Sequence, residues 1–418
     1  MRNEEAGEAY SADDDVPTLV AGEGFDLLQG VRVLDLTSSV AGPYSTMLLA
    51  DMGAEVIKVE RPGKGDDTRS WGPPFLQGEA LWFLSVNRNK RSIALDYSTP
   101  EGLAALKRLV KVCDVVVVNQ LPKVAVKLGV DAASLRKVRE DLIYVSITGF
   151  GLTGHRADWA CYDLIAEGYS GVMELTGEPF NGPQKIGTPA ADMLAGSDAA
   201  FAAVAALLAR HRTGRGRIVD IALVDSMTRF LTCRIVPYLG SGELPSRSGG
   251  KDSVIAIYQA FETADKPITL ALGNDNIWQR FWETVGEPHI GSLPRYATNA
   301  ERRLRREELV ERIEAILSQR TRAQWLSLFE LARIPAGPIN RVDEVAGDVH
   351  LQERGLFYRL QGQGRETPQV GTGIVLDGKA NKPRLAPPRL GEHTAEVLRT
   401  LLGCDEAELS SLRASGAI

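Results

Sequence analysis

The sequence is poor in the residues that build metal and disulfide sites. Its 418 residues include only four cysteines and five histidines. The cysteines lie far apart with no CxxC or CxxH spacing, and the histidines show no metal-ligand spacing either. We therefore expect a protein of a reducing compartment that binds no metal.

Basic charge and long apolar runs are also scarce. A net charge of -6 offers no basic stripe for a phosphate backbone, so we expect no nucleic-acid partner. The acidic N-terminus cannot act as a secretory signal. The longest notable apolar run, Ala199 to Ala209, is shorter than the ~20 residues needed to cross a bilayer. We expect a soluble, cytoplasmic protein that does not bind membranes.

What is present is an alternation of strands and helices. Short β-branched runs at 31–37, 55–60 and 114–120 predict strands, and the run after Thr99, with Pro100 at its first turn, predicts a helix. Strands that alternate with helices indicate a parallel sheet with right-handed crossovers. The fold class is therefore α/β.

Composition changes along the chain predict more than one domain. The stretch from Gly240 to Ser253 is rich in glycine and serine, and charged amphipathic segments follow it. The predicted division is a disordered acidic tail (1–28), the N-terminal part of a large domain (29–225), a linker and glycine loop (226–249), a small domain (250–335), and a linker that returns to the large domain (336–418).

One carboxylate stands among small residues in "TPAADMLAG", Thr188 to Gly196. Local sequence favours Asp192 as the N-cap of the helix that follows. The alternative is a reactive carboxylate, which a helix N-terminus would keep ionised. Ala191 and Gly196 carry almost no side chain, so a bulky ligand would have room beside it.

Several cations lie near predicted strand ends, and each has two interpretations. "NRNKRS" at 87–92 is either a solvated loop or a phosphate site, and Arg61 and Lys127 are further candidates. Glu60 follows the second strand, where nicotinamide enzymes recognise a ribose. The glycine fingerprint GxGxxG is missing, however, as are GxSxG and the Walker lysine motif.

Six segments, taken together and in this order, form a more specific pattern. They resemble the class III CoA-transferases, a family that includes formyl-CoA transferase, carnitine CoA-transferase and α-methylacyl-CoA racemase. The resemblance spans roughly residues 29 to 400 and rests on "GVRVLDLTSSVAGPYSTM", "NRNKRSIALD", "YVSITGFGLTG", "YDLIAEGYSGVMELTG", "TPAADMLAG" and "RHRTGRGRIVDIALVDSM".

The resemblance implies both a fold and a chemistry. It implies a Rossmann-like large domain with a parallel sheet, a smaller α+β domain, and a homodimer of interlocked protomers. Asp192 matches the nucleophile, which passes through a mixed anhydride and an aspartyl-CoA thioester. CoA thioesters are then substrates, and no cofactor stays bound.

Other site residues follow from the same resemblance. Arg61, Asn119 and Lys127 match positions that contact CoA. Gly249 and Gly250 match a glycine-rich loop that shields the intermediates from water. Tyr162 and Asp163 are further candidates for residues that contact the substrate or belong to a loop beside it.

Departures from the family pattern bear on the reaction. Racemases of the family carry a histidine where this chain has Tyr162, which favours transfer. Ser38 replaces an arginine found in relatives that act on dicarboxylates, and this substitution weakens a substrate assignment. The alternatives are a racemase or epimerase of the same fold and a non-catalytic CoA-binding protein.

Two further segments, "GDDTRSWGPPF" and "FLSVNRNKRSIALD", resemble enzymes that move CoA from succinyl-CoA to another dicarboxylate, such as glutarate, malate or itaconate. The expected partners are thus an acyl-CoA and a small carboxylic acid. Arg69 would pair with a distal substrate carboxylate. The alternative for Arg69 is a structural ion pair with Asp66 or Asp67.

Overall fold

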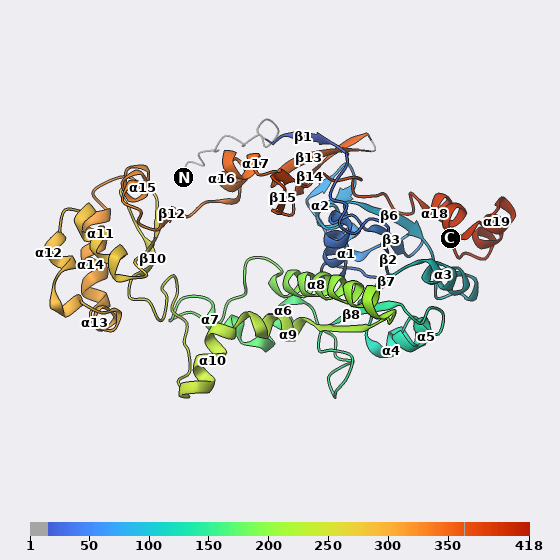
Figure 1. Cartoon of the computed structure of the whole chain (residues 1–418), viewed down its shortest axis with the longest axis horizontal. Coiled ribbons are helices and arrows are strands. Elements are labelled where there is room, and N and C mark those ends of the chain that lie inside the picture. The colour runs from blue at the N-terminus through green and yellow to red at the C-terminus, as the bar shows by residue number, and fades with distance from the viewer. Residues whose placement is uncertain (1–15, 363) are drawn as a thin grey trace, which may run out of the picture. The chain divides into compact units, whose positions relative to one another are not determined.

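The computed structural model describes residues 16–362 and 364–418, and the contacts between these residues divide them into two compact units. The first contains the described residues up to Ser170, Ile186–Thr232 and Ala346–Ile418. The second contains Gly171–Lys185 and Cys233–Val345. The segment predicted as a small domain, 250–335, lies within the second unit. Figure 1 shows the elements of both.

A six-stranded parallel sheet forms the centre of the first unit (Figure 1). Its spatial order is β6-β3-β2-β7-β8-β9. Numbered along the chain, this is the order 3-2-1-4-5-6 of dinucleotide-binding folds. The strands are β2 (Arg32–Asp35), β3 (Glu55–Glu60), β6 (Lys90–Ala94), β7 (Val115–Val118), β8 (Ile143–Thr148) and β9 (Ile218–Ala222).

Helices cover both faces of this sheet, which explains the unbroken apolar run of β7. On one face, Leu34 of β2 packs into a core with Leu106 and Leu109 of α3. On the other face, Thr46 of α1 hydrogen-bonds to Asp35. The helices of this unit are α1 (Ala41–Asp51), α2 (Leu81–Ser85), α3 (Pro100–Val112), α4 (Pro122–Leu128), α5 (Ala132–Arg136), α6 (Asp163–Ser170), α8 (Ala190–Thr213), α9 (Leu223–Phe230), α17 (Val349–Glu353), α18 (Thr394–Leu402) and α19 (Glu406–Ala414).

Short strands join the N-terminal segment to the C-terminal part of the chain. β1 (Thr18–Val20) pairs in parallel with β13 (Phe357–Gly362). The prediction of disorder for 1–28 is therefore wrong for residues 18–20, because the apolar "TLV" finds a sheet edge; residues 1–15 lie outside the described residues. The remaining strands of this unit are β4 (Phe75–Leu76), β5 (Glu79–Ala80), β14 (Arg365–Val370), β15 (Val375–Leu376) and β16 (Lys379–Ala380).

The chain end also returns to the large sheet. Arg384 donates to the backbone carbonyls of Ala50, Gly53 and Ala54, and the amide of Asp96 donates to the carbonyl of Ala417 at 2.8 Å. These contacts tie the last residues of the sequence to elements formed by the first hundred.

The second unit has its own core and an antiparallel sheet. Trp278, Phe281 and Phe329 lie in that core. Strands β10 and β11 pair in antiparallel orientation. The predicted linker 226–249 is wrong in part, because α10 falls within it. The elements are β10 (Tyr258–Phe261), β11 (Ile268–Ala271), β12 (Ala336–Pro338), α7 (Val172–Leu175), α10 (Thr232–Ser241), α11 (Asp275–Thr284), α12 (Pro288–Gly291), α13 (Asn299–Leu304), α14 (Arg306–Leu317), α15 (Arg322–Leu331) and α16 (Val342–Ala346), which ends at the boundary.

Helix α8 is longer than its apolar run suggested. Its buried residues are mostly alanine and glycine, whereas Phe201, Val204 and Leu208 are exposed on another side. Among the described helices, α8 is the one that by length and composition alone qualifies to cross a membrane, a test that core helices of soluble proteins also pass.

Candidate active site

The sheet order creates a crevice between β2 and β7. These strands are neighbours, but the chain leaves β2 toward β3 and leaves β7 toward β8, on opposite sides. In doubly wound sheets, ligands bind outside the carboxyl ends of strands at such a point. Here the crevice is bordered by the loop 36–40 after β2 and by Asn119 and Gln120 after β7.

Asn119 fixes the loop that follows β2. Its Oδ1 accepts the amide of Ser38 at 3.2 Å, and its Nδ2 donates to the carbonyl of Ser38 at 2.7 Å. The carboxamide thus spans the crevice and pairs with both backbone groups of one residue. Asn119 therefore fixes the backbone of Ser38 beside the predicted CoA site.

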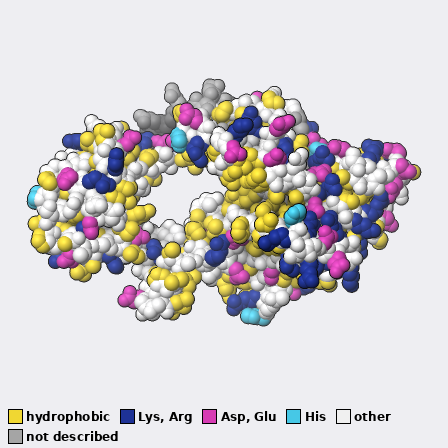
Figure 2. All heavy atoms as spheres, in the orientation of Figure 1, with side chains coloured by type: hydrophobic (Ala, Val, Ile, Leu, Met, Phe, Trp, Pro, Cys, Tyr) yellow, Lys and Arg dark blue, Asp and Glu magenta, His cyan; other side chains and the backbone are white. Residues whose placement is uncertain are grey.

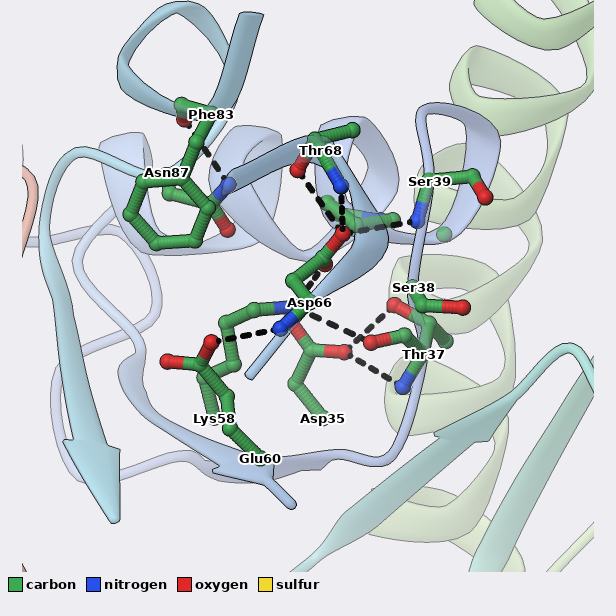
Figure 3. A network of polar contacts seen from close by, with 12 residues as sticks. Asp35, Thr37, Ser38, Ser39, Lys58, Glu60, Asp66, Thr68, Phe83 and Asn87 are labelled. Carbon is green, nitrogen blue, oxygen red and sulfur yellow. Dashed lines mark hydrogen bonds and ion pairs between the residues drawn. The ribbon is translucent and has the colours of Figure 1, made fainter. Parts of the chain in front are cut away.

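Buried charges support the same loop from below (Figure 3). The Nζ of Lys58 lies 2.7 Å from Oδ2 of Asp66 and donates to the carbonyl of Thr37 at 3.0 Å. Asp66 accepts the amide of Ser39 at 3.1 Å. Ser39 has a φ of 69°, a left-handed value that few residues other than glycine adopt. The network therefore holds the loop in a conformation that it would not adopt alone.

The ion pairs of this network keep its carboxyl groups ionised. Burial alone would raise the pKa of Asp35 and Asp66. The ammonium groups of Lys90 and Lys58 outweigh burial at Asp35, and Lys58 outweighs it at Asp66, so both pKa values fall below their usual range. Both carboxylates thus serve a structural role as partners of buried lysines.

The cations of "NRNKRS" contradict both interpretations given above. Arg88 is buried and donates to Asp51 at 2.6 Å, and Lys90 is buried 3.1 Å from Asp35. Arg91 is half-buried beside Glu55. The segment is neither a solvated loop nor a free phosphate site, because its cations form ion pairs with carboxylates that are distant in the sequence.

Arg69 is likewise paired within the fold. Its guanidinium donates to both oxygens of Glu60 at 2.7 and 2.8 Å and to Glu79 at 3.1 Å, and it stacks over Phe83. This geometry speaks against pairing with a substrate carboxylate, and the structural ion pair has Glu60 and Glu79 as partners instead of Asp66 or Asp67. Because both oxygens of Glu60 accept hydrogen bonds from Arg69, Glu60 is not available to recognise a ribose.

Two predicted CoA contacts remain available to a ligand. Arg61 follows β3 directly, Lys127 lies on α4, and both are exposed. Within the described part of the chain, neither forms an ion pair. Both belong to segments that begin at the carboxyl edge of the sheet, as the phosphates of a ligand in the crevice would require.

Asp192 is the third residue of α8 and not its N-cap. The N-cap is Pro189, which makes no side-chain cap hydrogen bond. The carboxylate of Asp163, on α6, accepts the amides of Ala191 at 2.8 Å and Asp192 at 3.3 Å instead. The capping interpretation of Asp192 is therefore wrong. Because α8 leads into a parallel strand, its N-terminus lies at the carboxyl edge of the sheet.

The environment of Asp192 acts against ionisation. Burial, and then the charge of Asp163, raise the pKa of Asp192 to about 7. The expectation that the helix N-terminus keeps this carboxylate ionised is thus wrong in direction, because desolvation and a like charge both favour the protonated form.

Cys161 belongs to this site, and local sequence gave no reason to place it there. Its side chain packs so closely on Gly149 that any Cβ at position 149 would lie 2.1 Å from its Cβ. Burial, followed by the charges of Asp192 and Asp163, raises the pKa of the Cys161 thiol to about 11. The neighbouring Tyr162 is 66% exposed, so its phenol is accessible.

The small residues on either side of Asp192 serve packing. A Cβ on Gly196 would lie 2.7 Å from the carbonyl oxygen of Ala41, at the start of α1. Ala191 and Ala195 are fully buried. The prediction that these positions provide clearance for an acyl-CoA is therefore not supported at Gly196, where the lack of a side chain lets α1 and α8 touch.

A cavity of about 280 Å³ lies beside the first turn of α8. Its walls are mainly apolar, and Figure 2 shows hydrophobic side chains gathered over this region of α1 and α2. The cavity joins the loop after β2 to the segment that precedes Asp192. Its lining includes Val40, Tyr44, Trp82, Arg88, Pro189 and Met193.

The predicted shielding loop lies in the second unit. The amide of Gly249 donates to the carbonyl of Gly177 at 3.1 Å, and Gly250 follows in an open environment. Both glycines thus belong to a loop tied to the 171–185 segment of that unit.

The fold and site define an α/β protein with a partly buried carboxylate at the carboxyl edge of a parallel sheet. Residues 28–394 match the model of CoA-transferase family III. The chain therefore belongs to this family.

Characterised relatives and a solved structure are similar over nearly the whole chain. A succinyl-CoA:glutarate CoA-transferase of Mus musculus is 40% identical over 94% of this chain and 90% of its own. A succinate–glutarate CoA-transferase of Agrobacterium fabrum is 42% identical over 90% of this chain and 95% of its own. A CaiB/BaiF family protein of Brucella suis superimposes with a TM-score of 0.80 at 39% identity, covering 91% of this chain and all of that one.

Proposed function

We propose that this protein transfers CoA from succinyl-CoA to a dicarboxylic acid, with glutarate as the first acceptor to test. Relatives at 40% and 42% identity carry that activity in their names, and they match this chain nearly end to end. Acetobacter aceti has a relative at 34% identity named for acetyl-CoA and oxalate, so the family match alone leaves the acid open.

Asp192 is the proposed nucleophile. Its carboxylate attacks the thioester carbonyl of succinyl-CoA, the C–S bond breaks, and CoA leaves as the thiolate. The thiolate then attacks the aspartyl carbonyl of the mixed anhydride and releases succinate. A glutarate carboxylate attacks the resulting aspartyl thioester, its C–S bond breaks, and an aspartyl-glutaryl anhydride and the CoA thiolate form. The thiolate finally attacks the glutaryl carbonyl of this anhydride, which yields glutaryl-CoA and releases the Asp192 carboxylate.

One observation carries this assignment. Asp192 is a largely buried carboxylate without an ion-pair partner among the described residues, in contrast to the paired carboxylates under the crevice loop. A raised pKa makes a carboxylate more basic and therefore more nucleophilic once it is ionised. Arg61 and Lys127, both unpaired and exposed, support CoA binding by the same unit.

A homodimer is part of the proposal. Phe201, Val204 and Leu208 form an exposed apolar row on α8, and Phe230 of α9 is exposed as well. Contiguous apolar surface of this kind is a common feature of subunit interfaces. A sedimentation mass equal to one chain would contradict the dimer.

The test is the exchange of labelled succinate into succinyl-CoA. Asp192→Ala is expected to abolish the exchange while the circular dichroism spectrum is retained. Asp225→Asn, which removes an exposed carboxylate on α9, is the matched control and should exchange like the wild type. Retained exchange in Asp192→Ala would reject the nucleophile.

An acceptor series with succinyl-CoA as the donor then identifies the acid. Glutarate, malate, itaconate and oxalate should differ in the rate at which they form a new thioester. Deuterium uptake at the carbon α to the thioester, without any acceptor acid, would instead indicate a racemase.

A further inference from the structure

We propose that Asp163 is a positioning residue for Asp192: it closes the first turn of α8 from a different helix, and its charge sets the pH range in which Asp192 is a nucleophile. The inference rests on the proposed function of Asp192. It concerns a residue that has, so far, only been a candidate for contact with substrate.

The cap of α8 has an unusual origin. A polar side chain at the N-cap often accepts one of a helix's first amides, but Pro189 has no side-chain hydrogen-bonding group. Oδ1 of Asp163 takes this place and accepts the amides of both Ala191 and Asp192. Because Asp163 is itself the first residue of α6, one carboxylate joins the beginnings of two helices.

This arrangement restrains the backbone of Asp192. An ordinary N-cap adjusts with its own helix, whereas a cap from α6 fixes the first turn of α8 relative to its neighbour. The position of the Asp192 carboxyl group therefore depends on the contact between α6 and α8. A small displacement of a reacting group lowers catalytic rates strongly, so this contact should matter for turnover.

The same carboxylate brings a negative charge next to Asp192. Within residues 16–362 and 364–418, Asp163 forms no salt bridge that would cancel this charge. Burial is the larger cause that raises the pKa of Asp192 to about 7, and the charge of Asp163 is the second.

The other titratable groups on the elements around α8 have partners, are neutral, or face solvent, as Asp225 of α9 does. On α9, Arg229 pairs with Asp198 further along α8. On β9, Asp220 accepts the amide of Leu152, and on α6, Glu167 accepts the amide of Ile186. Tyr44 of α1, with a raised pKa, and Cys161, with a thiol pKa of about 11, are neutral in the relevant range.

The acid limb of the pH–rate profile, which is the pH range over which kcat/KM rises with pH, follows from this geometry. Asp192 must be ionised to attack the thioester, so kcat/KM should rise with pH through about 7 in the wild type. Removal of the Asp163 charge should lower the pKa of Asp192 and shift the limb to lower pH. A purely structural cap would leave the limb where it is.

Two substitutions separate the cap from the charge. Asp163→Asn keeps a side-chain oxygen that accepts the two amides but removes the charge, so we expect the acid limb to move down by about one pH unit, the scale of ~1.4 kcal/mol per unit. Asp163→Ala also removes the acceptor. We expect it to shift the limb similarly and to lower kcat about tenfold further.

Asp131 provides matched controls. It caps α5 by accepting the amide of Ser134. Asp192 is not among the causes that shift the pKa of Asp131, and Asp131 is not among the causes that shift the pKa of Asp192. Asp131→Asn and Asp131→Ala should leave the acid limb unchanged. An equal shift in these controls would show that loss of any cap moves the limb, and would overturn the inference.

A second readout does not require catalysis. The gain in thermal stability caused by Asp192→Asn should increase with pH and become constant above the folded-state pKa of Asp192. In the Asp163→Asn background, the gain should become constant at a lower pH.

The two readouts make failures distinguishable. Exchange by the wild type with an unmoved limb in Asp163→Asn would overturn the inference and leave the proposed function intact. An absence of exchange in the wild type, combined with the shift in the stability readout, would overturn the proposed function and support the pairing of Asp163 with Asp192.

Discussion

Two sets of buried carboxylates in the first unit have opposite properties. Asp35 and Asp66 lie against Lys90 and Lys58, and their pKa values are lowered. Asp192 has a carboxylate beside it and a raised pKa. Burial acts in the same direction in all three, so the sign of the neighbouring charge decides the outcome. The paired groups hold the loop after β2, whereas the unpaired group is the proposed nucleophile.

The largest expected effect comes from breaking the paired set. Lys58→Met would leave Asp66 and Asp35 buried without an important partner, and we expect a loss of about 3–5 kcal/mol in the free energy of unfolding. Urea denaturation measures this loss. Lys64→Met, which removes an exposed pair with Asp67, should cost less than about 1 kcal/mol; equal losses in both variants would contradict the role given to Lys58.

The unpaired carboxylate should show the opposite sign. The folded-state pKa of Asp192, about 7, exceeds the ordinary value of 3.8, so the folded protein resists ionisation of this group. The penalty is absent below about pH 4, grows as the pH rises, and is complete above pH 7. Asp192→Asn should therefore raise the melting temperature by about 2 °C or more at pH 8, and by less at pH 5.

Differential scanning calorimetry of the wild type and Asp192→Asn at both pH values checks this expectation. A variant that is destabilised at pH 8 would mean that the Asp192 carboxylate is stabilised by partners, as Asp66 is, and would remove the contrast between the two sets.

The smallest effect on stability is expected at the exposed cations. Arg61→Ala and Lys127→Ala should change the free energy of unfolding by no more than about 0.5 kcal/mol. Each should raise KM for succinyl-CoA about tenfold, the scale of one charge-assisted hydrogen bond of ~1.5 kcal/mol. Lys111→Ala, at the opposite edge of the sheet, is the control, and an equal rise in KM there would contradict a specific CoA contact.

The sequence predicts the order of helices and strands better than it predicts the partners of their charged side chains. The α/β class follows from strands such as β7, whose apolar run requires cover on both faces, and Thr99 caps α3 as expected. For Arg88 and Lys90, the sequence suggests a phosphate site or a solvated loop, and both are wrong because their partners lie 37 and 55 residues earlier in the chain. For Arg69, the structural ion pair is the better alternative, although its partners are Glu60 and Glu79.

The candidate site shows the same limit. A motif identifies Asp192, but its neighbours do not reveal that Asp163 accepts its amide from 29 residues earlier in the chain. The missing side chain of Gly196 predicts space for a ligand, yet this position packs against Ala41. Local sequence indicates which groups are polar or small, and only the assembled helices determine what each one faces.

The return of the chain end to the large sheet has a consequence for synthesis on the ribosome. The carbonyl of Ala417 and the guanidinium of Arg384 complete contacts with residues translated more than 280 positions earlier. The second unit, in contrast, ends at Val345 and is translated before these contacts exist. These contacts of the large unit must therefore wait until Ala417 has been translated, and truncations that remove it disturb the assembly of this unit more than their distance from Asp192 in the sequence suggests.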